Sequence, residues 1–192
     1  MSGVRTLSGR LSLCFPRTHN VTIVQILSLA IRLVVLCVLL WLAVIDVRSR
    51  RLPTNIVLTI GALFFADAML QGMSVDDVLA HLLLALGVFL ICAALFAARM
   101  LGGGDAKLAS VIFLWAGLGL SLAALTLISV IGTLVSLVSL ATRNMDPSQR
   151  SQPMRALAMF SGARGVPYGV ALALGGGLVI VLPALLPLLL TR

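Results

Sequence analysis

The feature that most constrains this chain is a series of long apolar segments separated by short polar ones. From Leu108 to Ala141 no charged residue occurs, and four further segments carry at most one charged residue each. A helix needs roughly 20 apolar residues to cross a hydrocarbon core of ~30 Å. With 60% hydrophobic and 10% charged residues, the chain lies far from the balance of soluble domains. The sequence therefore predicts an all-α, polytopic protein whose solvent is the lipid bilayer.

The apolar segments predict about six membrane-spanning helices. As one helix, Leu108 to Ala141 would be about 50 Å long, so we divide it near Gly117 to Ser121. A polar N-terminal tail, residues 1–20, precedes a single membrane-embedded domain, residues 21–192. The helices are expected at 21–45, 53–73, 78–98, 106–120, 122–141 and 166–190.

The basic residues are divided unevenly between the two sides that these spans define. Arg5, Arg10, Arg17 and Arg192 fall on one side, and a larger group falls on the other. Because Lys and Arg in short loops accumulate on the cytoplasmic side, the larger group should be cytoplasmic. Reading 108–141 as one span would move four Arg outside, which favours the division. The larger group consists of Arg48, Arg50, Arg51, Arg99, Lys107, Arg143, Arg150, Arg155 and Arg164.

Composition and spacing argue against several classes of function. The net charge of +8 comes from Arg in short loops without interleaved aromatic residues, and Tyr168 is the only tyrosine, so we expect no nucleic-acid binding. The three cysteines and two histidines are scattered, without a CxxC pair or a second ligand nearby. We therefore expect no metal and no cofactor, and an ordinary polar position for His81.

Two aspartates stand at the boundaries of expected spans. Asp46 ends the first span and Asp105 begins the fourth, and an even number of crossings places both at the same, cytoplasmic face. Two carboxyl groups held close do not both ionise readily, so one keeps a proton while the other activates water. This pattern predicts the catalytic pair of an intramembrane-type aspartic protease. Taken singly, each is also interpretable as an interfacial charge beside Arg48 or Lys107.

The residues before Asp105 are Gly102, Gly103 and Gly104. Glycine lets the backbone come close to an extended substrate, as a peptidase requires. The alternative interpretation of this run is a flexible turn between two helices.

Two charged residues lie inside apolar segments. Arg32 interrupts the first, and we expect its guanidinium to snorkel outward or to mark an interfacial start of the helix. Asp67 lies about 21 Å along the second span, towards the outer end, on the wrong side to pair with Asp46 or Asp105. A proton-coupled transporter using these three carboxylates would need them spread through the membrane depth.

The two aspartates belong to motifs that together resemble a known family. Residues 46–53 (DVRSRRLP) and 102–108 (GGGDAKL) resemble the type IV prepilin leader peptidases, which are GxGD aspartic proteases of the bacterial inner membrane. Residues 166–169 (VPYG) are similar to a further family segment, and the resemblance covers roughly 46–175. By matching position, it implies Asp46 and Asp105 as the catalytic aspartates, with Gly102 and Gly104 as the glycines of GxGD.

The resemblance also implies a substrate and partners. The expected reaction removes the short basic leader of a prepilin or pseudopilin at the cytoplasmic face, just before its hydrophobic helix. The small size is similar to the branch that serves tight-adherence (Flp-type) pili, which adds other pilus assembly components as partners. Family members that also methylate the new N-terminus carry an added cytoplasmic domain, often with paired CxxC motifs. This chain has neither, so the resemblance implies a peptidase without N-methyltransferase activity.

Around the aspartates, Gly103, Pro53, Asn55 and Lys107 are expected to shape the loops and the substrate site. The family usually has Asn directly after the proline, whereas here Thr54 follows Pro53 and Asn55 comes next. Lys107 could stabilise Asp105 or anchor its helix at the lipid headgroups. A different class of function, a non-catalytic membrane scaffold of a pilus or secretion assembly, stays open from the sequence.

Overall fold

The structure, a computed structural model, describes residues 18–49, 53–141 and 168–190, and every element in them is a helix. All five helices are long and apolar enough to cross a membrane, which confirms the all-α polytopic membrane fold. Most of the polar tail and the basic loops at 50–52 and 142–167, with the Arg residues counted there, lie outside the described residues. The helices are α1 (Thr18–Ser49), α2 (Thr54–Gln71), α3 (Val75–Ala97), α4 (Gly103–Ala141) and α6 (Tyr168–Leu190).

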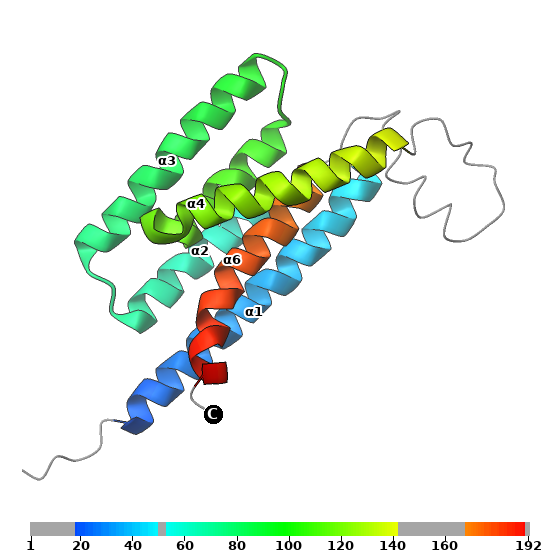
Figure 1. The fold of residues 1–192 in the computed structure, drawn as a ribbon. Helices are drawn as coiled ribbons and strands as arrows, with labels where there is room; N and C mark the ends of the chain where they lie inside the picture. Colours follow the sequence, from blue (N-terminus) through cyan, green and yellow to red (C-terminus); the bar gives the residue numbers. More distant parts are fainter. Residues whose placement is uncertain (1–17, 50–52, 142–167, 191–192) are drawn as a thin grey trace, which may run out of the picture.

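Helix α4 is broken at Gly117, where φ is 58° and ψ is −174°. Glycine adopts a positive φ readily because it has no Cβ. The green first part and the yellow-green second part of α4 run in different directions (Figure 1). The break falls on the first residue of the division expected at Gly117 to Ser121. The described residues form five helices of membrane length, or six helical segments when the two parts of α4 are counted separately, so the expected count of six spans is approximate.

Local signals fix the ends of α2 and α3. Pro53 precedes α2 with an extended backbone, and Gly72 follows α2 in the left-handed conformation typical of a helix C-terminus. Helix α3 begins after Ser74, whose hydroxyl accepts a hydrogen bond from the Asp77 backbone amide at 3.1 Å. These ends place α2 and α3 within about three residues of the expected spans, 53–73 and 78–98.

Helix α6 is the most enclosed element of the bundle. It lies between α1 and the second part of α4 (Figure 1). A Cβ on Gly175, Gly176 or Gly177 would come within 2.6–2.8 Å of a side chain on a neighbouring helix. Those neighbours are Ile128 in the second part of α4, Ile112 in the first part, and Leu36 in α1, respectively. Small residues allow this close approach, on which helix association in lipid depends.

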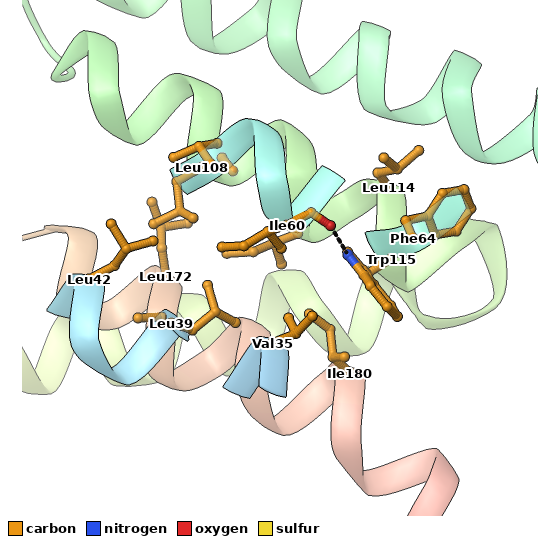
Figure 2. Close-up of a cluster of buried hydrophobic side chains, with 14 of the residues drawn as sticks. Val35, Leu39, Leu42, Ile60, Phe64, Leu108, Leu114, Trp115, Leu172 and Ile180 are labelled. Carbon is orange, nitrogen blue, oxygen red and sulfur yellow. Dashed lines mark hydrogen bonds between the residues drawn. The ribbon is translucent and has the colours of Figure 1, made fainter. Parts of the chain in front are cut away.

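The buried core joins α1, α2, α4 and α6. Figure 2 shows side chains from these helices meeting, among them Leu39, Ile60 and Ile180, and the Trp115 indole donates to the Ile60 carbonyl at 3.1 Å. Helix α3 contributes no fully buried residue and packs mainly on α4. The bundle therefore has a closed four-helix centre with α3 at its edge.

Candidate active site

Helix ends gather at one end of the bundle, and both predicted catalytic aspartates lie there. Asp46 is in the last turn of α1 and Asp105 is in the first turn of α4. Their carboxyl groups are close enough for the two charges to interact. The sequence predicted a common face, and in the structure the end of α1 and the start of α4 lie at the same end of the bundle (Figure 1).

The Asp46 carboxyl group is buried, with 6% of the residue exposed. The backbone of Gly169, in the first turn of α6, lies directly against it. A Cβ on Gly169 would stand 2.6 Å from the Asp46 Oδ2 and 2.7 Å from its Cγ. Sequence reasoning noted Gly169 only as part of a family-like segment and gave it no role. Its sole local signal was a glycine at the start of an apolar helix.

Two glycines of the run before Asp105 have close side-chain neighbours. The Gly102 carbonyl accepts a hydrogen bond from the Ala106 amide at 3.1 Å, which starts α4. A Cβ on Gly102 would lie 2.9 Å from the Asp105 Oδ2, and one on Gly103 would lie 3.2 Å from the Phe96 ring of α3. Gly104 is half-buried in the first turn of α4. Side chains at Gly102 and Gly103 would therefore crowd Asp105 and α3.

The turn between α3 and this run contains an unusual backbone conformation. Arg99 has φ of 61°, and the amide of Met100 donates to the Leu95 carbonyl at 2.9 Å, a pattern that closes helix C-termini. The position is normally glycine, because a side chain in the left-handed region costs about 1–2 kcal/mol. Strain of this kind tends to occur near functional sites.

Lys107 links the start of α4 to the start of α2. Its Nζ donates to the Thr54 Oγ1 at 3.0 Å. Thr54 is the residue that stands where the family usually has Asn, and here its hydroxyl supplies the acceptor. Asn55, the next residue, has an exposed side chain in the first turn of α2.

The Arg32 guanidinium points towards α2 and α6 within the bundle, so the expectation that it snorkels outward is wrong. Its Nη2 donates to the Asp67 Oδ2 at 2.9 Å, and its Nη1 donates to the Ile180 carbonyl at 3.1 Å. Gln71 also donates to the Asp67 Oδ2, at 2.6 Å. A counter-charge on the neighbouring helix pairs with the guanidinium inside the bundle, as intramembrane charges require, although Arg32 Nε and Asp67 Oδ1 have no hydrogen-bond partner among the residues that the structure describes. Fourteen residues of α1 separate Arg32 from Asp46, about 21 Å, so Asp67 is remote from the aspartate pair, as expected.

His81 of α3 occupies the break in α4. Its ring atoms lie 2.3 Å from the place where a Cβ on Gly117 would be, and its Nδ1 is 2.7 Å from the Leu114 carbonyl oxygen. Since a carbonyl only accepts, Nδ1 is the donor. The ring also stacks on Phe64 at 5.3 Å. We expected His81 to occupy an ordinary polar position. Instead, its side chain contacts both α2 and α4 from α3.

Within the ranges that the structure describes, no group of three His, Cys, Asp or Glu residues could hold a metal ion. Two carboxyl groups, one buried and one half-buried, lie at the junction of helix ends. Such a pair suits activation of a water molecule for attack on a carbonyl.

Comparison with protein-family models gives a match to the type IV leader peptidase family over residues 33–137, more than half of the chain. The match includes both Asp46 and Asp105. Searches of curated proteins and of solved structures find no match.

Proposed function

The chain belongs to the type IV leader peptidase family, and on that basis we propose that it is an aspartic endopeptidase that uses Asp46 and Asp105. Its substrate class is the prepilins, and it removes their short basic leader. We place the active site at the cytoplasmic face of the bacterial inner membrane, in the single membrane domain formed by residues 21–192. The pilin served is of the tight-adherence (Flp) type, and the product's new N-terminus stays unmethylated.

The observation that carries the proposal is that Asp46, in the last turn of α1, and Asp105, in the first turn of α4, lie at one end of the bundle, where their charges interact. One carboxyl group is ionised and accepts a proton from water as the water oxygen attacks the scissile carbonyl carbon. The other is protonated and donates a hydrogen bond to the developing oxyanion. Proton transfer to the amide nitrogen then allows the carbon–nitrogen bond to break, which releases the leader and the mature pilin.

The structure favours this function over a proton-coupled transporter. A transporter needs Asp67 as a step between the two membrane faces, whereas Asp67 is held by Arg32 and Gln71. That contact gives Asp67 a structural task within the bundle. Asp46 and Asp105 lie at the same end of the bundle, so they form a site rather than a path.

The experiment is co-expression of the chain with a tagged Flp-type prepilin in cells that lack their own prepilin peptidase. We expect the wild-type chain to yield the leader-shortened pilin, and mass spectrometry of its N-terminus reports the cut and the absence of methylation. Asp46→Asn and Asp105→Asn should each reduce the rate by at least about 100-fold, because each removes a group that exchanges protons in the reaction.

Asp76→Asn is the matched control, because Asp76 is exposed in the first turn of α3 and takes no part in the pair. It should process the prepilin at the wild-type rate at equal membrane abundance. Wild-type processing by Asp46→Asn or Asp105→Asn would refute the catalytic pair. A wild-type chain that processes nothing, yet is needed for pilus assembly, would favour the scaffold function instead.

A further inference from the structure

The contact between Gly169 and Asp46 joins two residues that are far apart in the sequence. Asp46 lies in the last turn of α1, and Gly169 lies in the first turn of α6. Three atoms of Asp46 are the nearest neighbours of a Cβ added to Gly169: Oδ2 at 2.6 Å, Cγ at 2.7 Å and Cβ at 3.1 Å. Real Cβ atoms essentially never approach another heavy atom closer than 3.0 Å, so a side chain at residue 169 requires movement.

Rotation of Asp46 alone does not remove the conflict. Turning the side chain about χ1 moves Oδ2 and Cγ, but the Asp46 Cβ stays 3.1 Å from the added methyl group. That separation is itself tighter than most real Cβ contacts. The carboxyl group therefore has to leave its present position, and the two helices have to separate slightly as well.

Helix α6 has little room to retreat from α1. On its far side, a Cβ on Gly175 would already lie 3.0 Å from the backbone nitrogen and Cα of Ile128, so the two helix backbones are in close contact. Figure 1 shows α6 held between α1 and this part of α4. The Arg32 guanidinium also ties α1 to α6 through the Ile180 carbonyl at 3.1 Å. A methyl group at residue 169 would therefore displace mainly the Asp46 side chain.

We infer that Gly169 is a positioning residue, whose missing side chain allows the start of α6 to set the place of the Asp46 carboxyl group. This inference rests on the proposed function for its catalytic meaning. Gly102 has the corresponding relation to Asp105, at 2.9 Å, but within a single turn of its own chain segment. Gly169 differs because it lies on another helix, so the position of α6 affects the position of the Asp46 carboxyl group.

The test compares Gly169→Ala with Gly87→Ala and Gly119→Ala. These two control glycines lie in α3 and in the second part of α4, and nothing stands within 4 Å of a Cβ added to either. In the prepilin assay, we expect Gly169→Ala to lower kcat by about 100-fold, since a displacement of about 1 Å in a catalytic group has that effect. KM for the prepilin should stay unchanged, and both controls should retain wild-type kcat.

A second measurement does not depend on activity. The midpoint of thermal unfolding of the purified protein is compared for Gly169→Ala in the wild-type chain and in an Asp46→Ala background. Crowding should lower the midpoint by roughly 2 to 10 °C in the first case. The shift should be much smaller in the second, because the carboxyl group that obstructs the methyl is gone.

The outcomes separate the inference from the proposed function. Wild-type kcat for Gly169→Ala, or equal midpoint shifts in both backgrounds, would overturn the positioning role. A loss of kcat matched by the two controls would do the same, because it would reflect glycine replacement in general. If the wild-type chain cleaves no prepilin, the proposed function fails, and the thermal comparison still decides whether Gly169 sets the place of Asp46.

Discussion

Breaking the ion pair between Arg32 and Asp67 should be the most damaging single change available in the middle of the bundle. The Nη2–Oδ2 distance is 2.9 Å, and the two side chains are only 18% and 4% exposed. With an effective dielectric constant of about 20, Coulomb's law gives an attraction of about 6 kcal/mol at this distance. Removing one partner leaves the other charge buried, for which measured costs are about 3–5 kcal/mol.

The perturbations are Arg32→Met, Asp67→Leu and the double variant. Each single change should lower the midpoint of thermal unfolding by roughly 6 to 20 °C in a chain of this size. The double variant should recover most of the loss, because an apolar pair leaves no uncompensated charge. Recovery should be incomplete, since Arg32→Met also removes the hydrogen bond to the Ile180 carbonyl and the contact of the guanidinium with the Trp115 ring, 5.9 Å from its centroid.

The assay is thermal unfolding of the detergent-purified protein, followed by tryptophan fluorescence, with Asp76→Asn as an exposed control. The control should unfold within about 1 °C of the wild type, because surface substitutions rarely exceed ±0.5 kcal/mol. Two results would refute the reasoning. One is a pair of single variants as stable as the control, and the other is a double variant whose loss equals the sum of the two single losses.

Two further predictions concern backbone conformation. Gly117→Ala should destabilise the protein by about 3 kcal/mol, since it combines a left-handed φ with a clash against the His81 ring, whereas Gly119→Ala should be neutral or stabilising in the same unfolding assay. Arg99→Gly should raise stability by up to about 1 kcal/mol because it relieves the positive φ, and an unchanged or lower midpoint would show that the Arg99 side chain contributes more than its strain.

Hydropathy predicted the features of the fold that depend only on position along the chain. The spans, the break at Gly117 and the common end of Asp46 and Asp105 all follow from segment length and from the number of crossings. The ends were predicted to within a few residues, although α1 continues through Arg48 to Ser49, beyond the expected end at residue 45. A basic residue is favourable in the last turn of a helix, so Arg48 does not end it.

The contacts that depend on helix rotation and lateral order were not predictable in this way. Whether Arg32 faces lipid or Asp67 depends on which side of α1 meets α2, and the hydropathy of a nearly uniform apolar helix contains no such information. The same holds for Gly169 against Asp46 and for His81 in the break at Gly117. Each needs two segments that the sequence separates by more than thirty residues.

Helix α6 covers α1 at two levels, at Asp46 through Gly169 and at Arg32 through the Ile180 carbonyl. Because synthesis proceeds from the N-terminus, α1 enters the bilayer while the helix that covers these two polar residues does not yet exist. Asp67 reaches Arg32 early, with α2, and can neutralise it during insertion. Asp46 is enclosed only after α6, the last described helix, has packed against α1.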